Sequence, residues 1–294
     1  MASNVSIAAC NFAVRPVKSF DEFADHVTGL LKDAQGADLV LFPELFTVEL
    51  FTTFDNWTEL PVAELIRLDE FTDDYRDLFG GLAKSANQYL VAGSHLMKEN
   101  GQYVNVGHLF EPDGTVHTHT KTHIFPAEAD WSTEEGDTIE AIQLPFAKVG
   151  FNICYEAEIP ECAATLAEQG AEIILCPSFT FTEYGFWRVR HCAQARAIEN
   201  QVYFVHCCTG GSPGAPLPNG WARSSILSPC DFLWTTDGIV AQADPNKEMV
   251  VRGVVDIDKL YENREAGAAP TFRDRRRRAN LYAKWPSHTV VTAR

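Results

Sequence analysis

Three residues able to carry out covalent chemistry lie at or near the ends of predicted strands. Glu44 and Cys154 each follow an apolar run that predicts a strand, and Lys121 lies in the predicted strand that begins at Val116. Strand ends are where an open α/β sheet collects its functional groups. A thiol, a carboxylate and an ammonium group brought together there would divide the work of nucleophilic catalysis. The thiol attacks, the carboxylate accepts its proton, and the ammonium group stabilises the developing oxyanion.

The residues after Cys154 distinguish this cysteine from a structural one. A cysteine in an apolar run is usually a buried, inert side chain. Here the run ends abruptly in the polar segment 155–159, and Pro160 then favours a helix start. This pattern predicts a turn from strand to helix, where backbone N–H groups lack partners. Glu44 and Lys121, taken singly, are equally consistent with a loop carboxylate and an edge charge.

The sequence predicts alternating strands and helices, and these elements would position the three residues. Apolar periodicity predicts helices over 19–34, in two pieces within 61–88, and over 160–169 and 183–201. Strands are predicted at 5–12, 38–42, 89–94, 104–110, 116–123, 139–144, 147–153, 172–176, 202–208, 224–227 and 250–257. Because both βαβ units and hairpins occur, we expect mixed β-sheets in an α/β fold, arranged as an α-β-β-α sandwich.

Five segments resemble the motifs of the nitrilase superfamily of carbon–nitrogen hydrolases, in that family's order and over nearly the whole chain. They are Leu41-Phe42-Pro43-Glu44, Lys121-Thr122-His123-Ile124-Phe125-Pro126, Gly150-Phe151-Asn152-Ile153-Cys154-Tyr155-Glu156, Arg196-Ala197-Ile198-Glu199-Asn200-Gln201, and Asp274-Arg275-Arg276 with Leu281-Tyr282. The resemblance implies the same α-β-β-α sandwich and a homodimer or higher homo-oligomer.

The resemblance also implies a Glu–Lys–Cys triad. Glu44 would be the general base, Lys121 would stabilise the tetrahedral intermediate, and Cys154 would be the nucleophile. The backbone N–H of Tyr155 would complete the oxyanion hole. The expected activity is hydrolysis of a non-peptide C–N bond in a small amide through a Cys thioester, which releases a carboxylic acid and ammonia or an amine. No metal or organic cofactor is expected.

Many members of this family use a second glutamate shortly after the lysine. Glu128, seven residues after Lys121, is the candidate here, and Glu134 and Glu135 are its weaker rivals. His117, His119 and His123 alternate with Lys121 and would share one face of a strand. Three imidazoles could bind a transition metal, but the lysine among them would repel a cation, so hydrogen bonding is the preferred interpretation.

The sequence leaves the substrate open. Tyr155-Glu156 after the nucleophile departs from both the Trp-Glu common in nitrilases and the Tyr-Asp common in amide and carbamoyl hydrolases, and we favour an amide. The alternatives are a nitrilase, an N-carbamoyl hydrolase, and a catalytically silent ligand-binding protein on the same scaffold. Phe179, Tyr184 and Trp187, together with Tyr155, are expected to line an apolar substrate pocket, although helix packing is an equal alternative for Trp187.

Composition limits the remaining possibilities. The chain has 294 residues, 46% of them apolar, and a formal charge of −16. Such a charge disfavours nucleic acid or an anionic membrane as partner, and no apolar run is long enough to span a bilayer. Eight cysteines within apolar runs, without a CxxC spacing, indicate free thiols in the cytoplasm. We expect one domain over 1–294, with about 258–294 as an extension used in assembly.

Overall fold

The computed structural model describes residues 4–284. Its strands are β1 (Asn4–Val14), β2 (Leu39–Leu41), β3 (Tyr89–Glu99), β4 (Gln102–Phe110), β5 (Val116–Thr120), β6 (Ala141–Gln143), β7 (Lys148–Phe151), β8 (Ile173–Phe179), β9 (Tyr203–Gly211), β10 (Ser225–Leu227), β11 (Ile239–Gln242) and β12 (Met249–Asp256).

Helices fill most of the connections between these strands. The α-helices are α1 (Phe20–Asp33), α2 (Thr72–Ala86), α3 (Pro160–Glu168), α4 (Glu183–Asn200), α5 (Ile257–Ala266), α6 (Thr271–Arg277) and α7 (Ala279–Tyr282). The short 3-10 helices are η1 (Phe46–Thr53), η2 (Trp57–Glu59), η3 (Val62–Phe71), η4 (Pro126–Asp130) and η5 (Cys154–Glu158).

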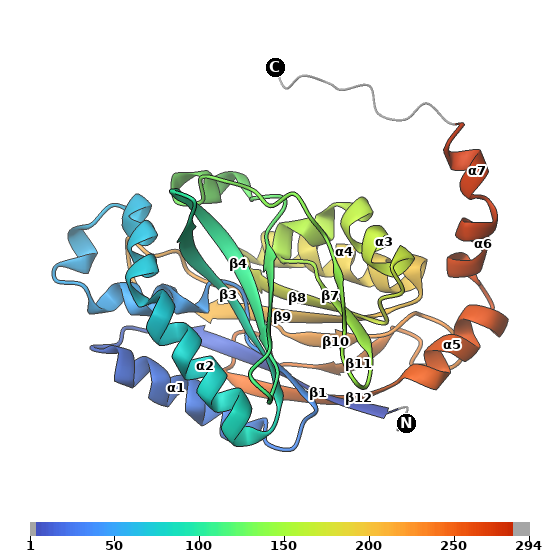
Figure 1. The fold of residues 1–294 in the computed structure, drawn as a ribbon, viewed down its shortest axis with the longest axis horizontal. Helices are drawn as coiled ribbons and strands as arrows, with labels where there is room; N and C mark the ends of the chain where they lie inside the picture. The colour runs from blue at the N-terminus through green and yellow to red at the C-terminus, as the bar shows by residue number, and fades with distance from the viewer. Residues whose placement is uncertain (1–3, 285–294) are drawn as a thin grey trace.

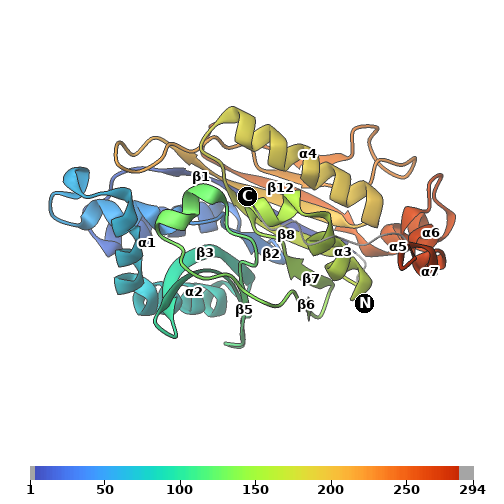
Figure 2. The same cartoon turned by 90° about the horizontal axis from the view of Figure 1, so that it is seen from above.

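Two mixed sheets pack face to face, and strand β1 joins them. Residues 4–11 of β1 pair with β12, and three of them also pair with β2; residues 12–14 pair with β9. From β1, one sheet continues through β2, β3, β4 and β5, and the other through β9, β8, β7 and β6. Helices α1 and α2 cover the first sheet and α3 and α4 the second (Figures 1 and 2). The expected α-β-β-α sandwich is confirmed.

Alternation along β1 shows why both faces of this sheet are buried. Ile7 and Ala9 point into the core between the sheets, whereas Ala8 and Cys10 point into the core beneath α1 and α2. Side chains of a strand alternate between its two faces, so a continuous apolar run is what a sheet covered on both sides requires. Helix α1 contributes a buried stripe that includes Phe23 and Val27.

The end of β2 is packed tightly against β3, and this packing places the segment that carries Glu44. The N–H of Phe42 donates to the Val91 carbonyl (2.8 Å). Pairing of β3 with β4 shifts register between Val91 and Ser94, and Gly93 lies at that irregularity with φ +62°. A Cβ at Gly93 would collide with the carbonyl oxygen of Pro43. Only glycine satisfies both the left-handed backbone and the close approach.

The structure agrees with the predicted elements and differs mainly at their ends. The two helical pieces between 61 and 88 are present, the first as the 3-10 helix η3. Strand β5 ends at Thr120 rather than at 123, so Lys121 lies just beyond the strand. Strand β11 and helices α5, α6 and α7 were not predicted, because their short or highly charged sequences show little apolar periodicity.

The chain after β12 runs along one end of the sandwich, where α5, α6 and α7 follow one another (Figure 1). Arg264 donates to the carbonyls of Gln201 (2.9 Å) and Ala171 (3.0 Å), and Arg276 to that of Ala167 (2.7 Å). The expected single domain covers 1–294, and its expected assembly segment covers about 258–294. Residues 1–3 and 285–294 of these ranges lie outside the part of the chain that the structure describes. Within residues 4–284, no helix is both long and apolar enough to cross a membrane.

We predict that Gly93→Ala lowers the free energy of unfolding by at least about 2 kcal/mol, because it adds left-handed strain and a backbone collision. Chemical denaturation measures the change. Gly81→Ala in α2 is the matched control: its Cβ meets nothing within 4 Å, so the exchange should stabilise the helix by about 0.5–1 kcal/mol. A fully stable Gly93→Ala protein would contradict this account of the β2–β3 contact.

Candidate active site

Lys121 lies between two carboxylates in the interior of the protein. Its Nζ is 2.7 Å from Oε1 of Glu44 and also forms an ion pair with Oε2 of Glu128. Lys121 is 1% exposed, Glu44 2% and Glu128 3%. These residues come from three separate segments: the one after β2, the one after β5, and the 3-10 helix η4. One cation and two anions leave this buried cluster with a formal charge of −1 when all three are ionised.

Additional hydrogen bonds hold both carboxylates in place. The backbone N–H of Phe179 donates to Oε2 of Glu44 (2.7 Å), and that of Phe125 to Oε2 of Glu128 (2.8 Å). The Asn105 side-chain amide donates to Oε1 of Glu44 (3.1 Å) and to Oε1 of Glu128 (2.9 Å). Sequence reasoning missed Asn105; its one signal was a polar residue within the apolar strand β4.

Cys154 lies beside this cluster, at the first residue of η5. Its φ of +47° is left-handed, which is unusual for a residue with a side chain. The residue is 6% exposed, and its Sγ lies 3.9 Å from the carbonyl oxygen of Phe179. Strained backbone of this kind gathers at functional sites. The predicted turn from strand to helix is therefore present, and it brings the thiol to the cavity described below.

Burial and neighbouring charges set the protonation states. Burial raises the pKa of the Cys154 thiol well above its usual value and the Glu44 charge raises it further, against the opposing effect of Lys121. Burial also raises the pKa of Glu44, which the Lys121 charge lowers and the Glu128 charge raises. Burial alone would lower the pKa of Lys121, but the two carboxylates more than reverse this effect. The raised pKa keeps the resting thiol protonated, and the thiol lies close to the Glu44 carboxylate.

Glu156 links the segment that carries Cys154 to the segment that carries Lys121. Its fully buried carboxylate accepts hydrogen bonds from the N–H of Ile153 (2.6 Å) and from the N–H and hydroxyl of Thr122 (2.8 and 2.7 Å). His119 Nε2 lies 3.0 Å from the same group. Burial acts to raise the pKa of Glu156, but its charged and hydrogen-bonded neighbours lower it overall. The carboxylate thus joins the residue before Cys154 to the residue after Lys121.

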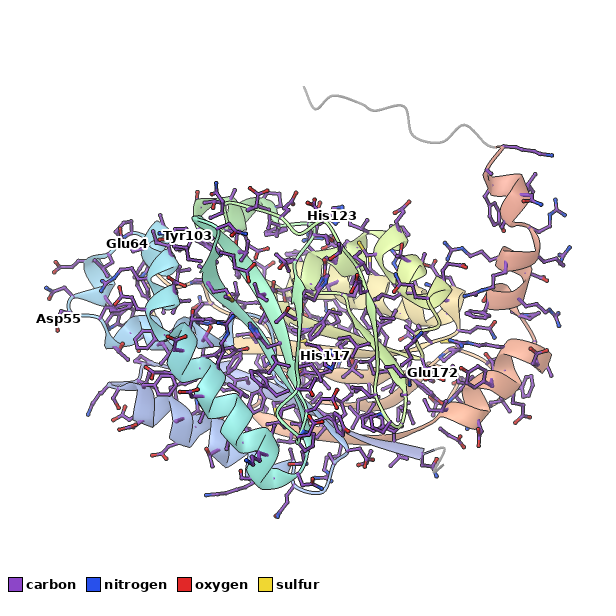
Figure 3. All side chains as sticks on the ribbon, in the orientation of Figure 1. Asp55, Glu64, Tyr103, His117, His123 and Glu172 are labelled. Carbon is purple, nitrogen blue, oxygen red and sulfur yellow. The ribbon has the colours of Figure 1, made fainter. Side chains whose placement is uncertain are left out.

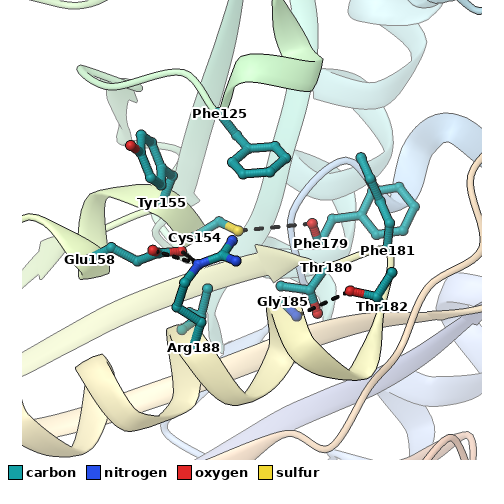
Figure 4. Close-up of a pocket in the computed structure, with 11 residues that line it drawn as sticks. Phe125, Cys154, Tyr155, Glu158, Phe179, Thr180, Phe181, Thr182, Gly185 and Arg188 are labelled. Atoms are coloured by element: carbon teal, nitrogen blue, oxygen red, sulfur yellow. Dashed lines mark hydrogen bonds and ion pairs between the residues drawn. The ribbon is translucent and has the colours of Figure 1, made fainter.

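A cavity of about 150 Å³ opens beside the Cys154 thiol. Tyr155 and Phe179 are among the residues that line it. Figure 4 shows the thiol facing this space, with the aromatic rings of Phe125 and Phe181 around it. Cys154, Phe179 and Phe181 also line a smaller, deeper cavity, together with Leu45, Glu44, Phe125, Glu128 and Trp131. The two cavities share four lining residues and are therefore neighbours, and the smaller one borders Glu44 and Glu128.

Tyr184 and Trp187, which were expected in the pocket, do not line it. Tyr184 is 88% exposed. Trp187 packs on Phe186, with ring centroids 5.2 Å apart, and donates its indole N–H to Glu183 (3.2 Å). In α4, Tyr184 and Trp187 each directly precede a residue that lines the cavity. Successive residues of a helix are turned by about 100° about its axis, so these two side chains point in other directions. Packing is therefore the correct interpretation of Trp187, and neither residue is retained as a substrate contact.

The remaining candidates lie apart from the cluster. Glu134 is exposed, and Glu135 accepts the N–H of Ile124 (2.8 Å). His117 bonds to Glu111 (2.7 Å), and Figure 3 shows it well separated from His123. The strand ends before His123, so the histidines do not form one row. Between residues 4 and 284, no group of three or more His, Cys, Asp or Glu side chains could hold a metal ion.

Comparison with known proteins identifies relatives across most of the chain. The chain is 38% identical over 282 residues to "Probable hydrolase YhcX" of Bacillus subtilis, covering 93% of this chain and 54% of that protein. It therefore spans about half the length of this relative. It is 30% identical over 285 residues to "Omega-amidase NIT2-A" of Xenopus laevis, covering 92% of this chain and 95% of the relative.

Solved structures share the fold. A carbon–nitrogen hydrolase from Helicobacter pylori superposes with a TM-score of 0.79 at 21% identity, covering 97% of this chain and 99% of that one. A double mutant of the amidase from Nesterenkonia sp. AN1, in complex with acrylamide, gives 0.74 at 19% identity, covering 97% and 98%. The family model described as carbon-nitrogen hydrolase matches residues 6–264. The chain thus belongs to the carbon–nitrogen hydrolase family and is a hydrolase of non-peptide C–N bonds.

Proposed function

We propose that this protein hydrolyses a small non-peptide amide to a carboxylic acid and ammonia or an amine, through a thioester on Cys154. The observation that carries the proposal is the ammonium group of Lys121, buried between Glu44 and Glu128 and next to a thiol at a strained turn. The chain's similarity to a protein named as an omega-amidase supports an amide as substrate. In this proposal Glu44, Lys121, Cys154 and Glu128 have the roles that the resemblance implies.

Acylation begins with a neutral thiol. Because its pKa is raised, Cys154 gives its proton to Glu44 as the sulfur attacks the amide carbon. The carbonyl π electrons move to oxygen, and the ammonium group of Lys121 and the N–H of Tyr155 stabilise the resulting oxyanion. The N–H is available because a helix leaves its first N–H groups without internal partners. Glu128 holds the ammonium group in place.

Collapse of this intermediate breaks the C–N bond. Protonated Glu44 returns the proton to the departing nitrogen, so ammonia or an amine leaves and a thioester remains on Cys154. A water molecule then gives a proton to Glu44 and attacks the thioester carbon. The second tetrahedral intermediate expels the sulfur, which recovers the proton from Glu44 as the acid leaves. Each half-reaction restores Glu44 to its ionised form.

We further propose that the protein works as a homo-oligomer in a reducing compartment, the cytoplasm. Helices α5–α7, at the end of the sandwich, extend the single hydrolase domain and contribute to assembly. Exposed Tyr261 on α5 and Val254 on neighbouring β12 support an interface there. All eight cysteines lie in the described part of the chain as free thiols, seven of them at least partly buried, and such thiols persist where glutathione keeps them reduced.

Trapping the acyl-enzyme tests the proposal. Intact mass spectrometry after acid quench, with matched amide, nitrile and carbamoyl substrates, should show an acyl adduct with an amide and none in Cys154→Ala. Cys192→Ala, another free thiol, is the control and should keep the adduct. An adduct that survives in Cys154→Ala would refute the assigned nucleophile. Turnover of the nitrile alone, or carbon dioxide released with ammonia, would refute the amide.

Glu128→Gln should lower kcat on an amide by about 10- to 1,000-fold, because the positioning of an oxyanion donor is lost. Glu134→Gln should leave kcat within twofold, since Glu134 is exposed and outside the cluster. Ammonia release at saturating substrate measures both. Equal rates for the two variants would remove Glu128 from the mechanism.

The pH dependence of kcat/KM should report Glu44. Protonated Glu44 cannot accept the thiol proton, so kcat/KM falls as the pH drops through the pKa of this residue. Burial and the Glu128 charge raise that pKa above its usual value of 4.5, and the midpoint of the acid limb should therefore lie above 4.5. Circular dichroism at each pH checks that the protein stays folded. A midpoint at or below 4.5 would exclude Glu44 as the base.

A further inference from the structure

His26 of α1 is a buried titratable residue that the catalytic cluster does not use. Its side chain is 3% exposed. Nδ1 of its ring lies 2.9 Å from Oε2 of Glu49 in η1, and Nε2 lies 2.8 Å from Oε2 of Glu248, which immediately precedes β12. We call these three side chains the His26 bridge. The bridge joins α1, η1 and the β11–β12 turn, which lie far apart in the sequence.

Backbone N–H groups around the end of β1 fix both carboxylates of the His26 bridge. Glu49 accepts the N–H of Arg15 (2.9 Å), and Glu248 accepts the N–H of Ala13 (3.0 Å). Glu49 is fully buried, whereas the side chain of Glu248 is 30% exposed. A groove of about 510 Å³ borders His26 and Glu248. Protons can therefore reach the bridge from the solvent.

The geometry of the bridge suits a charged imidazolium group. A neutral imidazole has a single N–H donor, so one of the two carboxylates would face a ring lone pair. Protonated His26 donates to both carboxylates at once. Burial acts to lower the pKa of His26, but the hydrogen bonds and charges of Glu248 and Glu49 more than reverse this effect and raise it above 6.5. The charge on His26 therefore persists at neutral pH.

Most other charged groups around the bridge are acidic. Three carboxylates of α1 border the same groove: Glu22, Asp25 and Asp33. Arg15 also borders it, with Nη1 4.0 Å from Glu248. Lys247, in the β11–β12 turn, pairs with Asp244 instead (3.1 Å). Burial raises the pKa of the Cys10 thiol in β1, so this group is neutral. Loss of the His26 charge thus leaves the carboxylates of the bridge in acidic surroundings, without the cation between them.

The bridge packs against the segment that follows Glu44. The His26 ring centroid lies 4.3 Å from that of Phe12, which lies 5.2 Å from that of Phe46. Phe46 is the first residue of η1, two residues after Glu44, and Glu49 belongs to the same 3-10 helix. A change of charge at His26 therefore acts on the short helix that follows Glu44.

We propose that the His26 bridge is a pH-sensitive switch, which holds η1 against α1 and the β11–β12 turn while His26 is protonated and releases η1 when the proton is lost. The sign follows from linkage. Because the pKa of His26 is higher in the folded protein than in the unfolded chain, the stabilisation is complete below pH 6.5 and is lost as the pH rises through the folded-state pKa. The switch belongs to the fold and does not depend on the substrate.

Chemical denaturation of the full chain between pH 6 and 8.5 tests the switch. In the wild-type protein the equilibrium constant for unfolding should rise by up to about tenfold for each pH unit between 6.5 and the folded-state pKa of His26. The double variant His26→Gln/Glu49→Gln replaces the buried ion pair by two neutral amides and should lose this rise. Hydrogen exchange of residues 45–54, corrected for its intrinsic pH dependence, should increase with pH in the wild-type protein only.

Glu248→Gln keeps the test decisive if the double variant does not fold, because this side chain is partly exposed. It removes one carboxylate from His26 and lowers the pKa of the ring, so the total rise should be at least about threefold smaller than in the wild-type protein. His191→Gln, at an exposed histidine of α4, is the matched control and should keep the full rise. An equal rise in the wild-type protein and in either bridge variant would overturn the inference. Exchange of residues 45–54 that does not change with pH in the wild-type protein would overturn it as well.

Discussion

The buried contact of Lys121 with Glu44 and Glu128 is the constraint on which the site depends. Burying a charge is costly unless it is paired and hydrogen-bonded, and removing one partner of a buried pair typically costs 3–5 kcal/mol. Here Lys121 pairs with both carboxylates, which repel each other, and Asn105 donates hydrogen bonds to oxygens on both of them. The ion pairs between one ammonium group and two carboxylates hold three chain segments together. They also leave one net negative charge beside a neutral thiol.

The fold brings these charged groups together because strands of both sheets end beside the buried cluster. Glu44 follows β2 and Lys121 follows β5, in the first sheet, whereas Cys154 follows β7 in the second. The two sheets are held in register by their shared strand β1 and by the apolar core between them. Glu156 adds a direct polar link, since it binds the backbone on both the cysteine and the lysine side. Cys154 and Lys121 are thus fixed relative to each other by packing and by hydrogen bonds.

The cavity divides the site into a deep charged part and an outer part. The deep part is lined by Glu44 and Glu128, which are almost fully buried. The outer part is mostly aromatic, and the N-terminal half of α4 contributes Arg188 to it. The buried charges and most of the outer wall therefore come from separate elements of the fold.

The sequence alone determined the order of most elements, the sandwich architecture and the residues that could react. Apolar periodicity depends on local geometry, and the ordered motifs identify Glu44, Lys121, Cys154 and Glu128 as candidates before any coordinates. Only tertiary structure showed that these four meet and that Asn105 bridges the carboxylates. It also moved Tyr184 and Trp187 out of the pocket and placed Arg188 in it. Periodicity reveals that a helix has an apolar face, but contacts between residues far apart in sequence depend on how sheets and helices pack, which local pattern does not encode.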